Sequence, residues 1–165
     1  MKKPKIILTR RWPGVVEDAL QEDFEVILNK SDRELNAFEL RQALQTADAV
    51  LPTVTDKIDA EVFDCGCLRT KILANFGVGY SHIDIDVAKK HGVTVTNTPE
   101  VLSECSADLT LTLMLMVARR AGEGERQLKS NTWSGWSPTH MMGTRLSGKS
   151  LGIIGFGRIG REVAK

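Results

Sequence analysis

Five short apolar segments recur at near-regular intervals in residues 1–100 and constrain the fold more than any other feature. They are rich in Ile and Val and end at polar or turn-forming residues, which is typical of buried strands. The five segments are residues 5–9, 24–28, 48–53, 71–76 and 93–97.

Helical patterns separate these segments. Apolar side chains share one face of a helix in residues 13–22 and 35–46, and residues 83–92 end in a basic turn and a glycine. Strands that alternate with helices imply right-handed crossovers and a mostly parallel sheet. We therefore expect residues 1–100 to form one doubly wound α/β unit. In such sheets ligands bind beyond the carboxyl ends of the strands, which directs attention to residues 51–55 and 75–80.

The pattern changes after residue 100. A helix that Ser103 or Ser106 caps is expected to run to about Ala118, and its nearly uniform apolar character predicts that it is buried. Gly122 is expected to end it. Residues 122–148 are polar and irregular, and a new strand is expected at Leu151. The sequence thus predicts a domain boundary near residue 100, which the long helix crosses.

Composition excludes several classes of protein. The 42% of hydrophobic residues suffices for a core, and a net charge of +1 argues against a nucleic-acid or anionic-membrane surface. The apolar run Ile6–Leu8 is too short for a signal peptide, and Leu109–Ala118 covers only half a membrane span. Three cysteines without a second Cys/His pair indicate a reducing compartment and no metal site. We expect a cytoplasmic protein that binds neither nucleic acid nor membrane.

The segment GFGRIG near the end of the chain fits the pattern G-x-G-x-x-G. Its glycines permit a tight turn, close approach of a pyrophosphate and close packing of helix on strand. The loop follows LGII and precedes REVAK, so strand, turn and helix are expected in that order. A plain turn is the alternative.

The acidic residue that selects NAD or NADP lies about 20 residues further on, so the choice between these cofactors is open. The expected cofactor-binding residues of the loop are Gly155, Phe156, Gly157, Arg158, Ile159 and Gly160.

Four segments together resemble the D-isomer-specific 2-hydroxyacid dehydrogenase family, and within it the glyoxylate/hydroxypyruvate reductase branch. They are NFGVGYSHIDID, GVTVTNTP, SADLTLTLMLMVARR and WSGWSPTHMMGTRLSGKSLGIIGFGRIG. The resemblance covers the N-terminal half of a family member. It implies a flavodoxin-like substrate domain in residues 1–100. Residues 101–165 would hold the crossing helix, a dimerisation arm with Trp133 and Trp136, and the first strand and helix start of a Rossmann NAD(P) domain.

The resemblance also implies roles for individual residues. The backbone amides of Val78 and Gly79 would bind the substrate carboxylate, and Asn75 and Leu51 would border the same cleft. Thr110 would contact the nicotinamide half of the cofactor. Two alternatives need no ligand. Asn75 could serve merely as a turn former, and the Thr110 hydroxyl could form a hydrogen bond with the backbone of its own helix.

The activity that the resemblance implies is NAD(P)-dependent reduction of a small 2-oxo acid such as glyoxylate or hydroxypyruvate. The catalytic arginine, glutamate and histidine of the family lie beyond the position of Lys165, so the 165-residue chain alone is expected to be inactive. No catalytic role is assigned to His82, His91 or His140. An alternative is a dinucleotide-sensing co-repressor module of the same fold. We also expect a homodimer or an exchanged oligomer, because an incomplete nucleotide domain exposes apolar surface.

Overall fold

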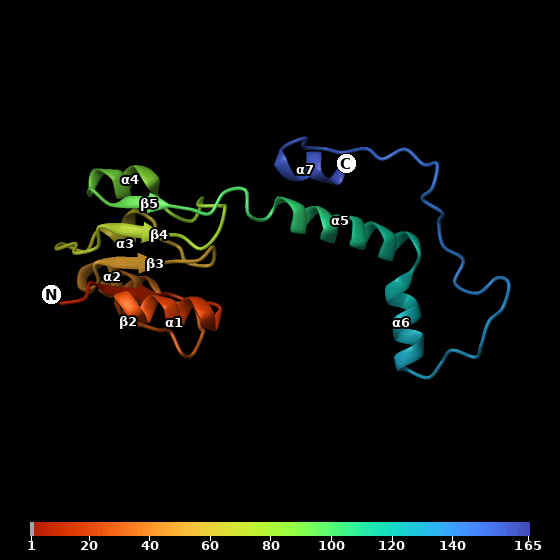
Figure 1. The fold of residues 1–165 in the computed structure, drawn as a ribbon, viewed down its shortest axis with the longest axis horizontal. Helices are drawn as coiled ribbons and strands as arrows, with labels where there is room; N and C mark the ends of the chain where they lie inside the picture. The colour runs from red at the N-terminus through yellow and green to blue at the C-terminus, as the bar shows by residue number, and fades with distance from the viewer. Residues whose placement is uncertain (1) are drawn as a thin grey trace. The chain divides into compact units, whose positions relative to one another are not determined.

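The computed structural model describes residues 2–165, and these divide into two compact units. The first unit ends at Pro99, and the second comprises Glu100–Lys165. Figure 1 shows the elements of each unit, and each unit is treated by itself.

A five-stranded parallel sheet forms the centre of the first unit, in the order β2-β1-β3-β4-β5. This order is that of flavodoxin-like doubly wound folds, so the predicted fold class is confirmed for this unit. Each strand lies within the apolar segment that predicted it, because Ile and Val side chains fill both faces of a parallel sheet. The strands are β1 (Lys5–Leu8), β2 (Glu25–Ile27), β3 (Ala49–Leu51), β4 (Ile72–Ala74) and β5 (Thr94–Thr96).

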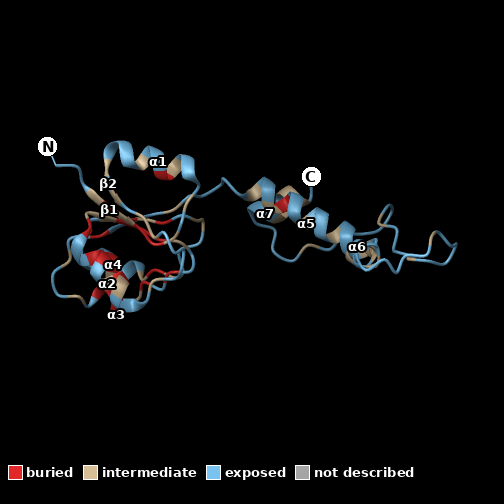
Figure 2. Ribbon diagram, turned by 90° about the horizontal axis from the view of Figure 1, so that it is seen from below, coloured by how far each residue is buried: buried red, intermediate tan, exposed pale blue. Residues whose placement is uncertain are grey.

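Helices cover both faces of this sheet. Figure 2 shows α1 on one face and α2, α3 and α4 on the other. The larger hydrophobic cluster lies on the face of the three helices and includes Leu44, Phe63 and Leu73, whereas a smaller one contains Ile6 and Leu8. The helices are α1 (Gly14–Asp23), α2 (Ala37–Thr46), α3 (Ala60–Phe63) and α4 (Ile85–Lys90).

The second unit is helical, with α5 (Ser103–Ala118), α6 (Ala121–Lys129) and α7 (Arg158–Val163). Two predictions about α5 are wrong. Its N-cap is Leu102, which has no capping side chain, so neither Ser103 nor Ser106 caps it. Gly122 does not end it either, because a left-handed Arg120 (φ 56°) breaks the chain direction and Gly122 then lies inside α6. The expectation of irregular chain from residue 122 is therefore wrong as far as Lys129.

The prediction that α5 is buried is also wrong. Ala107 is its only buried residue among those that the structure describes, and Figure 2 shows most of the helix as exposed. Leu109 and Val117 are 59% and 79% exposed. The apolar pattern shows that these side chains would favour burial. The second unit, however, holds too few packed elements to cover every face of this helix.

The strand expected at residues 151–154 is absent from the structure, and this prediction is wrong. The segment has no regular secondary structure, and Ile154 is fully exposed. A strand requires a neighbour for its backbone hydrogen bonds, and the described residues of the second unit contain no other strand. The helix start that follows does form, as α7. Across residues 2–165, every helix is too short or too polar to cross a membrane.

Candidate functional site

The loop of residues 75–79 follows β4 at the carboxyl edge of the sheet. The backbone amide of Asn75 donates to the Thr96 carbonyl at 3.0 Å, and that of Phe76 donates to the Pro52 carbonyl at 2.8 Å. The loop is therefore anchored to the ends of both neighbouring strands, β3 and β5, which fixes its position at the edge where ligands of such sheets bind.

Two asparagine side chains hold three consecutive carbonyl groups of this loop. Asn75 is 2% exposed, and its Nδ2 donates to the carbonyls of Gly77 (3.2 Å) and Gly79 (2.9 Å). Asn97 Nδ2 donates to the Val78 carbonyl at 2.8 Å. The oxygens of residues 77–79 are thus all occupied by donors of the protein.

The amides of Val78 and Gly79 have no such partners. Within residues 2–165, neither N–H group donates a hydrogen bond, whereas the Gly77 amide donates to the Asn75 carbonyl at 3.0 Å. Val78 is half-buried and Gly79 is exposed. Two adjacent N–H groups without acceptors in the protein are the kind of donors that bind an anion. The arrangement can accept a carboxylate without any charged side chain.

Close packing limits which residue can stand at position 77. A Cβ atom on Gly77 would lie 3.1 Å from Val54 Cγ1 and 3.7 Å from Asn75 Nδ2. The approach to Val54 is tighter than an ordinary carbon–carbon contact, so a larger residue at position 77 would require Val54 or the loop to shift by a few tenths of an ångström.

His82 contacts the other end of the Asn75 side chain. Its Nε2 lies 3.0 Å from Asn75 Oδ1, and the ring is half-buried. Burial lowers the pKa of His82 below its ordinary value, and the negative charge of Asp56 opposes this shift more weakly. Sequence reasoning gave His82 no role and did not single out Asn97. The signal for Asn97 was its place directly after a predicted strand, at the same edge as Asn75.

Leu51 is placed differently from the two amides. It ends β3, is 5% exposed, and its side chain belongs to the hydrophobic cluster of Ile6 and Leu8. Its carbonyl accepts the Thr9 amide at 3.2 Å. Leu51 therefore stabilises the strand ends beside the loop, and its contact with a substrate stays a prediction.

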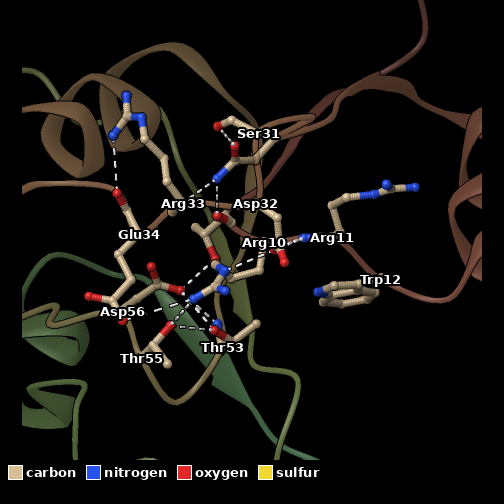
Figure 3. Close-up of polar contacts among 12 residues, drawn as sticks. Arg10, Arg11, Trp12, Ser31, Asp32, Arg33, Glu34, Thr53, Thr55 and Asp56 are labelled. Carbon is tan, nitrogen blue, oxygen red and sulfur yellow. Dashed lines mark hydrogen bonds and ion pairs between the residues drawn. The ribbon is translucent and has the colours of Figure 1, made fainter.

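A polar cluster lies at the carboxyl ends of β1 and β3 (Figure 3). The Asp56 carboxylate is 1% exposed and accepts the Thr9 hydroxyl and, at 2.8 Å, the Thr53 amide. Nearby, Arg10 Nε donates to Asp32 Oδ1 at 3.0 Å, and this bond raises the pKa of Arg10 and lowers that of Asp32. Because Thr53 also pairs with Phe76 in an isolated parallel bridge, the cluster adjoins the 75–79 loop.

The glycine-rich loop of the second unit has the backbone that its sequence predicts. Gly155 adopts a φ of +89°, and Gly157 is the N-cap of α7. A Cβ on Gly160 would overlap the Gly155 carbonyl oxygen, so only glycine fits there, whereas Gly157 faces open space. In the described chain the amides of residues 156–159 donate no hydrogen bonds. Free amides and an unobstructed Gly157 fit a phosphate group.

The side chains of Arg158 and Thr110, two residues of the predicted cofactor site, have partners within the second unit. Arg158 Nη2 pairs with Glu100 Oε1 at 3.3 Å. The Thr110 hydroxyl donates to the Ser106 carbonyl of its own helix at 2.8 Å. Thr110 lies beside Leu113 and Val117 in an apolar groove of about 760 Å³. Its contact with a nicotinamide stays a prediction.

Comparison with known proteins decides the family. The profile of the catalytic domain of D-isomer specific 2-hydroxyacid dehydrogenases matches residues 6–157. The chain belongs to this family. Both loops described above lie in the matched region, except for the last residues of the second loop.

Individual relatives agree with this assignment. The chain is 40% identical to the glyoxylate reductase of Thermococcus onnurineus over 167 residues, which is 99% of the chain and 50% of that enzyme. The TT0316 protein of Thermus thermophilus has a TM-score of 0.89 at 41% identity, with 97% of this chain and 51% of that one covered. For the NADPH-dependent glyoxylate/hydroxypyruvate reductase of Sinorhizobium meliloti, in complex with NADP and malonate, the TM-score is 0.75 at 28% identity, with 99% and 49% covered. The chain thus spans about half the length of these three proteins.

Proposed function

We propose that this chain is the substrate-binding and cofactor-anchoring half of an NAD(P)-dependent reductase of small 2-oxo acids. The observation that carries the proposal is the pair of free amides at Val78 and Gly79, beside carbonyls that Asn75 and Asn97 hold inward. A 2-oxo acid presents a carboxylate next to its reactive carbonyl. Two fixed N–H donors would bind that carboxylate and so orient the neighbouring carbonyl for reduction.

Glyoxylate and hydroxypyruvate are the proposed substrates. The relatives include glyoxylate reductases, and the Sinorhizobium reductase was crystallised with NADP and malonate, which is itself a small carboxylate.

The proposed cofactor is NAD or NADP, with its pyrophosphate at residues 155–160. The free amides of residues 156–159 and the open space at Gly157 support this placement. When bound, the nicotinamide ring supplies the hydride. Thr110 is proposed to lie near that ring, where its hydroxyl oxygen can accept a hydrogen bond while its proton is donated to the Ser106 carbonyl.

The domain roles follow from the two loops. Residues 1–100 would be the substrate domain, and residues 101–165 would provide the crossing helix, a dimerisation arm and the beginning of the cofactor domain. Trp133 (50% exposed) and Trp136 (84% exposed) support pairing of two copies through the arm. The odd number of cysteines supports a cytoplasmic location.

The proton donor of the reaction is proposed to lie in the half of the relatives that this chain does not span. The 165 residues alone would then bind ligands without turnover. We would join residues 1–165 to the second half of the Thermococcus enzyme and follow oxidation of NADH and NADPH with glyoxylate and hydroxypyruvate. Turnover by the fusion and none by the 165-residue chain is the expected result.

Two variants at one position test the carboxylate site in that fusion. Val78→Pro removes one N–H donor, whereas Val78→Ala keeps it. A hydrogen bond to a charged group is worth about 1.5–3 kcal/mol, so Val78→Pro should raise KM roughly 10- to 100-fold while Val78→Ala changes it little. Absence of turnover with every 2-oxo acid, or equal KM values for the two variants, would contradict the proposal.

A further inference from the structure

The orientation of the Asn75 carboxamide is determined by the groups around it. One end of the group lies 3.2 Å and 2.9 Å from the carbonyl oxygens of Gly77 and Gly79. Only the NH₂ end can donate to two carbonyls, so the oxygen Oδ1 is the atom that faces His82. An amide oxygen only accepts hydrogen bonds, and the 3.0 Å contact therefore requires a proton on His82 Nε2.

The surroundings make this proton position costly to change. Asn75 is 2% exposed, so loss of the His82 donor would leave a buried oxygen without a partner. Burial also lowers the pKa of His82, which favours the neutral ring with a single proton. The backbone of His82 is fixed as well, because its carbonyl accepts the Ile58 amide at 2.8 Å.

We propose that His82 is a positioning residue for the carboxylate-binding loop, and that it acts as the Nε2–H tautomer through Asn75. By donating to Asn75 Oδ1, His82 keeps the two N–H groups of the carboxamide on the carbonyls of Gly77 and Gly79. Those carbonyls then stay turned inward, and the Val78 and Gly79 amides stay available to an anion. This inference rests on the proposed binding of a carboxylate at these amides.

The role predicts a specific pattern of defects. His82 touches neither amide of the pair, so its loss should weaken carboxylate binding without changing which residues the carboxylate contacts. Gln places a donor nitrogen near the position of Nε2, whereas the shorter Asn cannot reach it. His82→Gln should therefore retain the function, and His82→Asn and His82→Phe should lose it.

The tautomer can be read directly in the 165-residue chain. Nitrogen NMR of imidazole-labelled protein at neutral pH distinguishes a ring protonated at Nε2 from one protonated at Nδ1. We expect His82 to be neutral and protonated at Nε2. A ring protonated at Nδ1, or a rapid mixture of the two tautomers, would overturn the inference even if every variant failed to fold.

Binding is tested in the same chain with oxamate, a 2-oxo acid analogue that is not reduced. Amide shifts of Val78 and Gly79 should respond in the wild-type chain and in His82→Gln, and the Kd should rise about fivefold in His82→Asn and His82→Phe. If the wild-type amides do not respond, the proposed carboxylate site is wrong and the role of His82 falls with it. If they respond equally in all four chains, the site stands and only the role of His82 is overturned.

Discussion

The side-chain nitrogen of Asn75 lies 2.9 Å from the carbonyl oxygen of Gly79, four residues later in the chain. This contact closes the loop after β4 upon itself, and within residues 2–165 the Val78 and Gly79 amides donate no hydrogen bond. A residue that simply formed a turn would not need to be buried or to bind two carbonyls with one NH₂ group. The structure therefore assigns Asn75 a larger part in the loop than that of a turn former.

Replacing Asn75 by Asp should open this loop. A carboxylate cannot donate, and it would face the carbonyls of Gly77 and Gly79 in a buried position, so we expect a loss of about 2 kcal/mol or more in the free energy of unfolding. Urea denaturation measures the loss. The exposed Asn131→Asp exchange introduces the same charge elsewhere and should have little effect. Equal stability of the two variants would show that the Asn75 carboxamide does not hold the loop.

The depressed pKa of His82 makes stability depend on pH in a defined direction. The unfolded chain has the ordinary histidine pKa of about 6.5 and takes up a proton at a higher pH than the folded chain does. The contribution of His82 is thus complete above about pH 6.5 and is lost as the pH falls through the folded pKa. Urea denaturation at about pH 7 and pH 5 should show a larger fall in stability for the wild type than for His82→Gln. An equal fall would contradict the shift.

A methyl group at Gly160 should distort the glycine-rich loop. The Cβ of Ala would overlap the Gly155 carbonyl oxygen, so Gly160→Ala must displace the start of α7 or the turn before it. In the fusion with the Thermococcus half, we expect the KM for NADH and NADPH to rise at least tenfold. Gly152→Ala is the matched control, because its Cβ meets no atom within 4 Å and should leave this KM unchanged. A normal KM in Gly160→Ala would argue against close packing at this position.

The exposed apolar surface of α5 should drive self-association. Leu113 is 52% exposed and lines the apolar groove beside Thr110. A charge there would cost free energy in any interface that buries it, so Leu113→Glu should shift the chain toward the monomer in sedimentation velocity, whereas Leu113→Met should not. A wild-type chain that stays monomeric at high concentration would rule out pairing through this helix.

The sequence predicts the first unit well because its signals are local. Runs such as Lys5–Leu8 and Ile72–Ala74 are short, rich in Ile and bounded by polar residues, and the rules for parallel connections then leave few strand orders. The position of the 75–79 loop at the carboxyl edge follows from the same rules. The fold of residues 2–99 is therefore predictable from the sequence alone.

The errors concern features that depend on distant partners. The burial of α5 depends on whether other elements cover its apolar face. Residues 151–154 likewise form a strand only if another strand lies beside them. Neither condition can be read from the segment itself. His82 and Asn97 belong to the loop only through contacts with Asn75 and Val78, and no spacing rule connects them. Arg120, the N-cap of α6, has a left-handed conformation that few non-glycine residues adopt. The sequence therefore has no glycine at the break between α5 and α6 that would have predicted it.

The carboxylate site proposed at residues 75–79 would be assembled entirely from uncharged groups. Its donors are main-chain amides, which neither titrate in the physiological range nor vanish when a side chain is exchanged. The affinity of such a site would depend on how firmly the carbonyl groups of residues 77–79 are held away from the bound anion. If the proposal holds, substitutions at Asn75, His82 or Asn97 would change the recognition of a carboxylate without any of these side chains touching the ligand.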